Sequence, residues 1–553
     1  MSSLADADEA LLVLVLRGPF SALYGNAAGG VIQVFTESGV SPPTVTTTGA
    51  NAKLDVKVSE ATTFTVLGNH VNLPGAQDPL GLTRSEFDAN ARQVNPLAVQ
   101  FNTRKNLEQT QGGARVRHAF NTTQTLELVV YTGERAVRQF QAIPVATQRP
   151  ATYPGGVIDF DRNYYGADAR FVQSGAWGNV AVGATSDVLN ENRRGYQNFI
   201  GTTLGAVSST LGAASNTLGV LSALRRDEKN KLTSTDAYAQ GEWRVLPDAS
   251  IHAGVRASSV KLVSADKYIV AGNGDDSGSV RYSAVLPSVG MNWRVMSALS
   301  LYASAGRGIE TPTLNELAYR PPGSVPATGL NLSLLPARSD SVEIGAKWRR
   351  DGVNAELALF DTKTKDEIVV ASNSGGRSAF ANAGRTQRRG IELSTRAQLD
   401  PWVAGLQWEL AANALDARYR DAFKTCGAPP CAVPSVLVAA GNRLPGVPNR
   451  AAWTELKWTH TSGVYVAAEV KLQGRVIVND VGDESVNAVT LLGARIGVQQ
   501  QWGKARWSAF LRGDNLSGKT YAGTVIVNEA NRRYFEPAAG RSWLAGVSLS
   551  LGW

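Results

Sequence analysis

Residues 542–553, SWLAGVSLSLGW, alternate between two kinds of side chain. One set of alternate positions is apolar or aromatic: Trp543, Ala545, Val547, Leu549, Leu551 and Trp553. The other set is small and polar apart from Leu544: Ser542, Gly546, Ser548, Ser550 and Gly552. Because successive side chains of a β-strand point to opposite faces, this stretch predicts a strand with one face suited to lipid and the other to a polar lumen.

The same pattern recurs upstream, in residues 283–293, 341–349 and 352–361. A strand that crosses a bilayer needs about 9–11 residues. Residues 341–349 show the pattern well, because Val342, Ile344, Ala346 and Trp348 alternate with polar or small residues. The repetition predicts many transmembrane strands rather than one.

The lengths of the connections carry a second signal. Short turns are predicted at Ser59–Thr62, Asn121–Thr123, Pro247–Asp248, Met296–Ser297, Arg350–Asp351, Thr461–Ser462 and Gly503–Lys504. Long connections are predicted at Asn72–Thr110, Glu134–Gly166, Asn190–Leu232, Lys261–Val280, Gly308–Asp340, Thr362–Arg389, Asp416–Asn449 and Asn515–Arg541. Short and long alternate, as in barrels with short periplasmic turns and long external loops. About twenty strands are expected, and the even number suits a single-chain bacterial barrel.

The composition agrees without deciding the fold. The 553 residues include 55 Gly, 12 Trp and 15 Tyr but only 2 Cys, which fits an outer-membrane barrel and also a soluble β-rich protein. No run of about 18 apolar residues is present, so no membrane-spanning helix is expected. The net charge of +8 fits solvated loop charges better than a specific attraction to lipopolysaccharide.

Near the amino terminus, residues 17–36 read RGPFSALYGNAAGGVIQVFT. Glycines and a proline predict a tight turn that feeds a strand, and no Gly-Lys-Ser/Thr follows that would make a phosphate loop. The string closely resembles the end of the plug domain of TonB-dependent outer-membrane receptors. The residues that carry the resemblance are Arg17, Gly18, Pro19, Tyr24, Gly25, Gly29 and Gly30.

Four later stretches resemble barrel motifs of the same family in the expected order: residues 306–317, 382–393, 444–448 and 514–521. The terminal Trp553 resembles the aromatic signal for barrel insertion, where Phe is usual. The resemblance implies an all-β, transmembrane antiparallel β-barrel of about 20–22 strands with a short remnant of the plug. Residues 1–39 would be that remnant and residues 40–553 the barrel.

Two departures from the family lead to further hypotheses. The family barrel has twenty-two strands, so a strand pair is expected to be missing near Gly49–Ala50–Asn51. Most of the plug, the TonB box and an export signal are not recognisable, so the chain is expected to be a fragment or to have a misassigned start. As it stands, it is not expected to support TonB-dependent uptake, and it should leak small solutes if it inserts.

The resemblance implies a monomeric receptor in the bacterial outer membrane that takes up a ferric siderophore or similar scarce ligand. Its partners would be that ligand, the TonB complex, and outer-membrane lipid and lipopolysaccharide, but no nucleic acid. Iron would be carried only as the ligand's chelate, with no resident cofactor. The alternatives are a passive diffusion porin, an outer-membrane enzyme, for which no catalytic residues are evident, and a soluble β-protein.

Candidate ligand contacts lie at the mouth of one long connection: Arg307, Glu310, Tyr319 and Arg320. Cationic and aromatic side chains there could hold an anionic iron chelate, but a polar external loop would also contain them. The four histidines, at positions 70, 118, 252 and 460, lack metal-ligand spacing. Residues 272–278 predict an external turn rather than a calcium loop. A loop disulfide is expected between Cys426 and Cys431, because the cell surface is oxidising.

Overall fold

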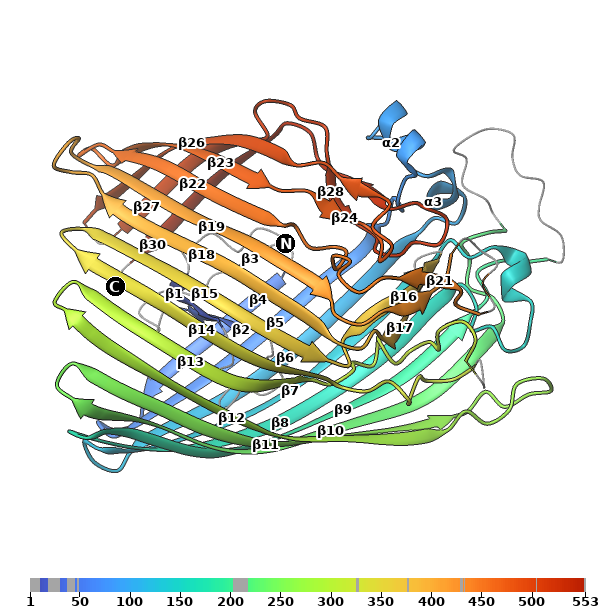
Figure 1. Cartoon of the computed structure of the whole chain (residues 1–553), viewed down its shortest axis with the longest axis horizontal. Helices are drawn as coiled ribbons and strands as arrows, with labels where there is room; N and C mark the ends of the chain where they lie inside the picture. Colours follow the sequence, from blue (N-terminus) through green and yellow to red (C-terminus); the bar gives the residue numbers. More distant parts are fainter. Residues whose placement is uncertain are drawn as a thin grey trace.

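The computed structural model describes residues 10–17, 30–36, 45–46, 49–201, 217–324, 328–374, 377–427, 431, 433–503 and 505–551. Most regular structure in these residues is β-strand, and the long strands form one antiparallel sheet curled into a barrel (Figure 1). None of the described helices has the length and apolar character to cross a membrane. The all-β class predicted from the sequence is therefore confirmed.

The barrel sheet consists of β3 (Val45–Thr46), β4 (Gly49–Lys57), β5 (Thr62–Gln77), β6 (Arg104–Ala119), β7 (Gln124–Phe140), β8 (Val157–Gly175), β9 (Gly178–Tyr196), β10 (Leu224–Leu246), β11 (Ala249–Asp266), β12 (Gly278–Met296), β13 (Leu299–Glu310), β14 (Ala337–Arg350), β15 (Val353–Lys365), β18 (Thr386–Gln398), β19 (Leu406–Tyr419), β22 (Arg450–Thr459), β23 (Val464–Gln473), β26 (Val489–Trp502), β27 (Ala505–Asp514) and β30 (Ser542–Leu551).

Within the described residues the barrel sheet has twenty strands, which matches the number counted from the sequence. Neighbours pair antiparallel, so the strand direction alternates along the series. The number of strands is even only because β3 is counted, and β3 has just two residues, which pair with β4. The loss of a strand pair before β4 stays a hypothesis.

Short and long connections alternate as predicted, and they separate the barrel into a turn end and a loop end (Figure 1). Residues 247–248, 297–298 and 351–352 are turns, whereas residues 311–336 form a long connection. The predicted connections were too long, however. Residues 190–232 were expected to be a loop, but β9 continues to Tyr196 and β10 starts at Leu224. Near the loop end both strand faces are polar, so the alternation that marked the strands disappears.

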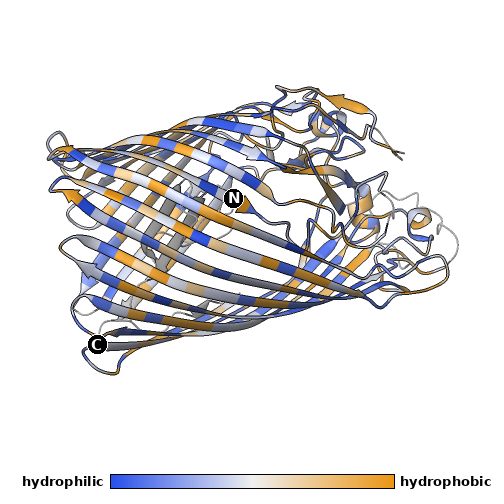
Figure 2. Cartoon of the chain, turned by 60° about the horizontal axis from the view of Figure 1, so that its bottom comes forward, coloured by the Kyte–Doolittle hydropathy of each residue, from blue (hydrophilic) through white to orange (hydrophobic). Residues whose placement is uncertain are grey.

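The barrel is apolar outside and polar inside over its central part. On β14, Val342, Ile344 and Trp348 are exposed, whereas Ser341 and Glu343 are buried against the interior. Figure 2 shows this alternation of apolar and polar residues along the strands. It is the distribution expected where the outer surface meets lipid rather than water.

The loop end carries the smaller elements of the described chain (Figure 1). They are α2 (Arg84–Ala89), α3 (Pro96–Gln100), the 3-10 helix η1 (Val145–Gln148), and four hairpins: β16 (Ile368–Ser374) with β17 (Arg377–Asn382), β20 (Phe423–Thr425) with β21 (Val436–Val438), β24 (Val476–Ile477) with β25 (Ser485–Val486), and β28 (Ala522–Val525) with β29 (Phe535–Pro537).

The 311–336 connection is anchored by an apolar cluster at the loop end. Its side chains Leu314, Leu317, Leu330 and Leu334 are buried together with Leu262 of β11. Partly buried residues of β9, β10, β12, β16 and β17 pack around them. This cluster holds the connection against the inner wall of the barrel and so positions the residues discussed below.

Two further strands, β1 (Ala10–Arg17) and β2 (Gly30–Thr36), pair antiparallel in a sheet of their own, with Arg17 opposite Gly30. A strand was expected after the turn in residues 17–36, and β2 is that strand. The turn itself, with Gly18, Pro19, Tyr24, Gly25 and Gly29, lies outside the described residues. The division into a plug remnant and a barrel stays a prediction.

Candidate functional site

Buried polar side chains gather on the inner face of β9 and β10 near the loop end. Glu191 and Arg193 alternate on β9, and Arg226, Glu228 and Asn230 alternate on β10. In the strand register, Arg193 lies opposite Glu228 and Glu191 lies opposite Asn230. Directly opposite residues of antiparallel strands are close enough to interact, so the five side chains form one network.

Three arginine side chains from three different elements surround Tyr319 of the 311–336 connection. The guanidinium carbons lie 4.4 Å (Arg377), 5.3 Å (Arg226) and 5.7 Å (Arg193) from the centre of the tyrosine ring. Arg193 Nη2 also donates a hydrogen bond of 3.3 Å to the phenol oxygen. Cations over an aromatic face are attracted by its quadrupole, which stabilises this arrangement. We call these four residues the arginine–tyrosine cluster.

The three arginines differ in how fully they are neutralised. Arg226 makes two hydrogen bonds to the Glu228 carboxylate, of 2.7 and 2.9 Å. Arg377 donates to the backbone carbonyl of Gly155 at 2.7 Å. Arg193 is almost fully buried, and its Nη1 atom has no hydrogen-bond partner among the described residues. Arg193 therefore retains a buried donor that is unsatisfied among the described residues.

The surroundings of the cluster carry more positive than negative charge. Arg162 of β8 is paired with Glu191 at 2.6 Å, and the same carboxylate accepts a bond from Asn230. Together with the three cluster arginines, four guanidinium groups face the carboxylates of Glu191 and Glu228 and that of Asp266, which lies buried opposite Glu228 on β11; this leaves one positive charge in excess. An anionic ligand would balance this excess.

The arginines also change the acidity of Tyr319. Burial alone would raise the pKa of this phenol, but Arg377, Arg193 and Arg226 outweigh burial and lower the pKa to about 8. A phenol with this pKa loses its proton in mildly alkaline solution. The charge of the cluster therefore depends on pH just above neutrality.

The structure brings only part of the predicted ligand set together. Tyr319 lies at the centre of the cluster, and Arg320 follows it in the same connection. Arg320 acts electrostatically on Asp276, and its Nε atom has no hydrogen-bond partner within the described residues. Whether these residues contact a ligand stays a prediction.

Glu310 belongs to a separate, acidic corner at the end of β13. Its carboxyl group lies near those of Glu316 and Glu367 and near the guanidinium group of Arg388. Arg388 itself is paired with Glu367 at 2.5 Å. Glu310 is therefore not part of the arginine–tyrosine cluster.

Arg307 does not join the cluster. It points outward on β13 in the same direction as Leu301, and its Nε atom is 3.0 Å from the Asp340 carboxylate of β14. The alternation of strand side chains explains this: a residue three positions before Glu310 must face the opposite side. Arg307 is thus placed to meet solvent or lipid headgroups.

The sequence analysis missed Arg193, Arg226 and Arg377. The first two could have been found by continuing the strand alternation into the expected loop, because both share the inner face with buried neighbours. Arg377 could not, because its position depends on how the β16–β17 hairpin folds back over the barrel.

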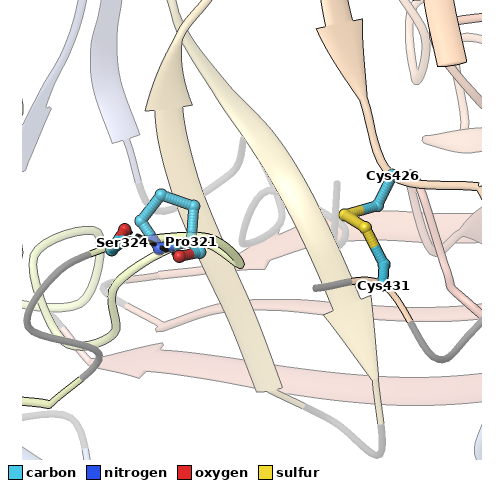
Figure 3. Close-up of a disulfide and its surroundings, with 4 residues drawn as sticks. All are labelled: Pro321, Ser324, Cys426 and Cys431. Carbon is cyan, nitrogen blue, oxygen red and sulfur yellow. Dashed lines mark hydrogen bonds between the residues drawn. A yellow bond between two sulfur atoms is a disulfide. The ribbon is translucent and has the colours of Figure 1, made fainter. Parts of the chain in front are cut away.

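The predicted cysteine pair is joined by a disulfide in the structure (Figure 3), with the Cα atoms of Cys426 and Cys431 5.8 Å apart. It lies in the connection that contains β20 and β21. No group of three or more His, Cys, Asp or Glu residues in the described chain is arranged to hold a metal ion. In the 267–277 connection, Asp275 accepts a bond from the Ser277 backbone, as in a turn.

A shallow cavity of about 470 Å³ lies elsewhere, between β15, β18, β19 and the connection after β21. Its charged lining residues are already paired: Arg389 with Asp361 at 3.0 Å, and Arg443 with Asp416 at 3.2 Å. This cavity offers less uncompensated charge to a ligand than the arginine–tyrosine cluster.

Comparison with known proteins agrees with this fold. The family model described as "TonB dependent receptor-like, beta-barrel" matches residues 51–516. The siderophore receptor PiuA of Acinetobacter baumannii superposes with a TM-score of 0.70 at 14% identity, covering 100% of this chain and 87% of that one. The ferric yersiniabactin uptake receptor FyuA of Yersinia pestis superposes with a TM-score of 0.68 at 15% identity, covering 98% of this chain and 84% of that one.

P. aeruginosa FpvA, in a structure with a bound pyoverdine–iron complex, gives a TM-score of 0.71 at 14% identity and covers 99% of this chain and 76% of that one. At such identities these structures support the fold alone. The family match spans most of the chain, and the family consists of outer-membrane receptors and transporters, not enzymes. The chain therefore belongs to the TonB-dependent receptor family and is an outer-membrane protein.

Proposed function

We propose that this chain forms the barrel of a receptor for an anionic iron chelate, a ferric siderophore or a chemically similar scarce ligand, whose uptake is driven through the TonB complex. The observation that carries the proposal is the arginine–tyrosine cluster, with its excess of positive charge and the unpartnered Nη1 atom of Arg193. Carboxylate, catecholate and hydroxamate oxygens bound to Fe³⁺ would accept hydrogen bonds from such guanidinium groups.

In this proposal the loop end faces the outside of the cell, residues 1–39 are the end of a plug domain, and residues 40–553 form the barrel of a monomer. The iron is cargo inside its chelate and needs no protein ligands. Three structurally similar proteins support this assignment: one is described as a siderophore receptor, one as a ferric yersiniabactin uptake receptor, and one is bound to a pyoverdine–iron complex. A passive porin is less well supported, because the matching family consists of receptors.

The test is direct binding of ferric chelates to the purified chain in detergent. Binding is measured by the quenching of tryptophan fluorescence. The Arg193→Gln/Arg377→Gln double variant should weaken binding of a tricarboxylate or catecholate chelate by about a hundredfold, as expected for two lost charge-assisted hydrogen bonds. The matched control is Arg307→Gln, which removes an outward arginine and should leave the affinity unchanged.

Equal binding by the wild-type chain and the double variant would count against the arginine–tyrosine cluster as the ligand site. A larger loss in Arg307→Gln than in the double variant would move the site to the outer rim of β13. Heat-modifiable migration on gels would establish that every variant has folded before its affinity is compared.

A further inference from the structure

A carboxylate is buried at the loop end, where several connections of the barrel meet. Asp480, in the connection between β23 and β26, is 1% exposed, and within the described chain no cation is paired with it. A buried carboxylate normally has a cationic partner, because taking a charge out of water is costly. Asp480 is instead held by neutral donors.

Two side chains from other connections bind the Asp480 carboxylate. The Tyr419 hydroxyl, at the end of β19, donates to Oδ1 at 2.6 Å. Asn528 Nδ2, in the connection between β27 and β30, donates to Oδ2 at 2.8 Å. In return, the Asp480 backbone N–H donates to Asn528 Oδ1 at 3.0 Å. Asp480 and Asn528 are thus bonded in both directions, and the Tyr419 side chain is fully buried beside them.

The same residues hold two further segments in place. Asn442, in the connection after β19, donates to the Asp480 backbone carbonyl at 3.0 Å. Asn528 Nδ2 also donates to the backbone carbonyl of Val370 on β16, at 2.6 Å. The connections that follow β15, β19, β23 and β27 therefore meet at one place. We call Tyr419, Asp480 and Asn528 the Asp480 junction.

Strand β16 links the Asp480 junction to the arginine–tyrosine cluster. The Asn373 backbone donates to Asn528 at 3.3 Å and accepts from Ala530 at 2.8 Å. Strand β16 pairs with β17, which begins at Arg377, and the Arg377 guanidinium carbon lies 4.4 Å from the centre of the Tyr319 ring. The position of Arg377 therefore depends on whether the Asp480 junction is closed.

The charges around the junction do not neutralise Asp480. The ionisable groups there are Glu367 and Arg388, paired at 2.5 Å; Asp483 and Arg532, paired at 3.3 Å; and Glu529 and Tyr534, which accept hydrogen bonds from Arg533 and Asn479. Burial raises the pKa of the Asp480 carboxyl group, although Tyr419 and Asn528 oppose the rise by hydrogen bonding to the carboxylate. The closed junction thus favours the protonated form.

This preference works in both directions. If the closed junction favours the protonated carboxyl group, protonation must favour the closed junction to the same extent. The stabilisation from Asp480 is complete below the ordinary pKa of an aspartate, about 4, and is lost as the pH rises through the raised pKa. Acid should therefore tighten the junction, and neutral solution should loosen it.

We propose that Asp480 makes the loop end of this barrel sensitive to pH, because the four connections are held together in acid and separate when the carboxyl group ionises. Separation would release β16, and with it Arg377. This behaviour belongs to the ligand-free chain and does not depend on the proposed uptake function.

The experiment uses the purified full chain in detergent, with nitroxide labels on cysteines introduced by Val481→Cys and Ser372→Cys. Position 481 is exposed and follows Asp480, position 372 lies on β16, and the two native cysteines are joined in a disulfide. Pulsed electron paramagnetic resonance measures the distance between the labels. We expect one short, narrow distribution at about pH 4, and a ratio of closed to open conformers that falls on the order of tenfold by about pH 8.

Three variants assign the effect to Asp480. Asp480→Asn cannot ionise and should keep the short distance at every pH. Tyr419→Phe removes a donor that favours the ionised carboxylate, so opening should shift to higher pH. The matched control is Asp483→Asn, which changes an exposed carboxyl group of the same connection and should open over the wild-type range. Infrared spectra of the labelled samples should contain a band of the protonated carboxyl group that Asp480→Asn lacks.

A distance distribution that stays constant between about pH 4 and pH 8, or opening in acid, would overturn the proposal. So would an Asp480→Asn variant that opens over the wild-type range or is open at every pH, because another group would then control the junction. A shift of the Tyr419→Phe profile to lower pH, or no shift, would also contradict it. Heat-modifiable migration establishes that each variant has folded. No chelate is present, so the result is separate from the test of uptake.

Discussion

Buried arginines are costly unless something neutralises them, and the arginine–tyrosine cluster is only partly neutralised. Taking a guanidinium group out of water requires a partner for its charge and its donors. Arg226 has such a partner in Glu228. Arg193 lies under the 311–336 connection with one donor free in the described structure. At the scale of single residues, the cluster holds excess positive charge in a buried position. This is unfavourable, and a bound anion would neutralise it.

Tyr319 gives this cluster a pH dependence. With a pKa of about 8, its phenol is neutral at pH 7 and becomes a phenolate at higher pH. The phenolate would cancel part of the positive charge, so we expect the affinity for an anionic chelate to fall between pH 7 and pH 9 by about tenfold. Tyr319→Phe cannot ionise and should show a flat affinity over this range. Binding titrations at several pH values measure the affinities of the wild-type chain and of Tyr319→Phe. A parallel decline of affinity in the variant would assign the pH dependence to another group.

At the scale of elements, the 311–336 connection shows how a long loop becomes an ordered part of a site. Its leucines are buried with Leu262 of the barrel wall, so the connection is held by apolar burial as well as by hydrogen bonds. This burial fixes Tyr319 opposite the arginines of β9 and β10. Without it, side chains on a free loop would have no common geometry.

Leu317→Ala should therefore loosen the connection without unfolding the barrel. The side chain is 1% exposed, and truncating a buried leucine costs about 2–5 kcal/mol. We expect faster limited proteolysis within residues 311–336 and weaker chelate binding, with the same heat-modifiable barrel band. Leu335→Ala is the matched control, because Leu335 lies in the same connection but is 51% exposed. Similar proteolysis of both variants would show that the leucine cluster does not anchor the connection.

At the scale of the whole molecule, the barrel wall separates two environments. The outward side chains of β13 and β14 are apolar over the central band, and the inward ones are polar. The arrangement reverses that of a soluble β-protein, because the solvent outside is lipid.

A lysine should be tolerated on one face of this wall and not on the other. Ile344→Lys places a charge in the lipid-facing band and should destabilise the folded barrel in bilayers by about 2–4 kcal/mol. Ser304→Lys on the neighbouring strand faces the interior beside Glu343, which lies directly opposite in the register, and should be close to neutral. Urea titration of each variant in lipid vesicles measures the difference. Equal destabilisation would contradict the assigned faces.

The sequence by itself determined the strands, their faces and the alternation of short and long connections. These features depend on the two-residue period of a strand and on the polarity of its two environments, and both are local properties. Near the loop end the outer environment is water, so the outward side chains of residues 191–196 are polar like the inward ones. Without an alternation of apolar with polar residues, this stretch was expected to be a loop. For the same reason Arg307 was grouped with Tyr319, although its strand position places it outside.

Only the tertiary structure decided which distant residues meet. Arg193, Arg226 and Arg377 reach Tyr319 from β9, β10 and a hairpin separated by many strands along the chain. The curvature of the sheet and the burial of the 311–336 leucines bring them together, and neither leaves a periodic trace in the sequence. The position of Arg193 opposite Glu228 likewise depends on strand register, which is set by contacts between strands rather than within one.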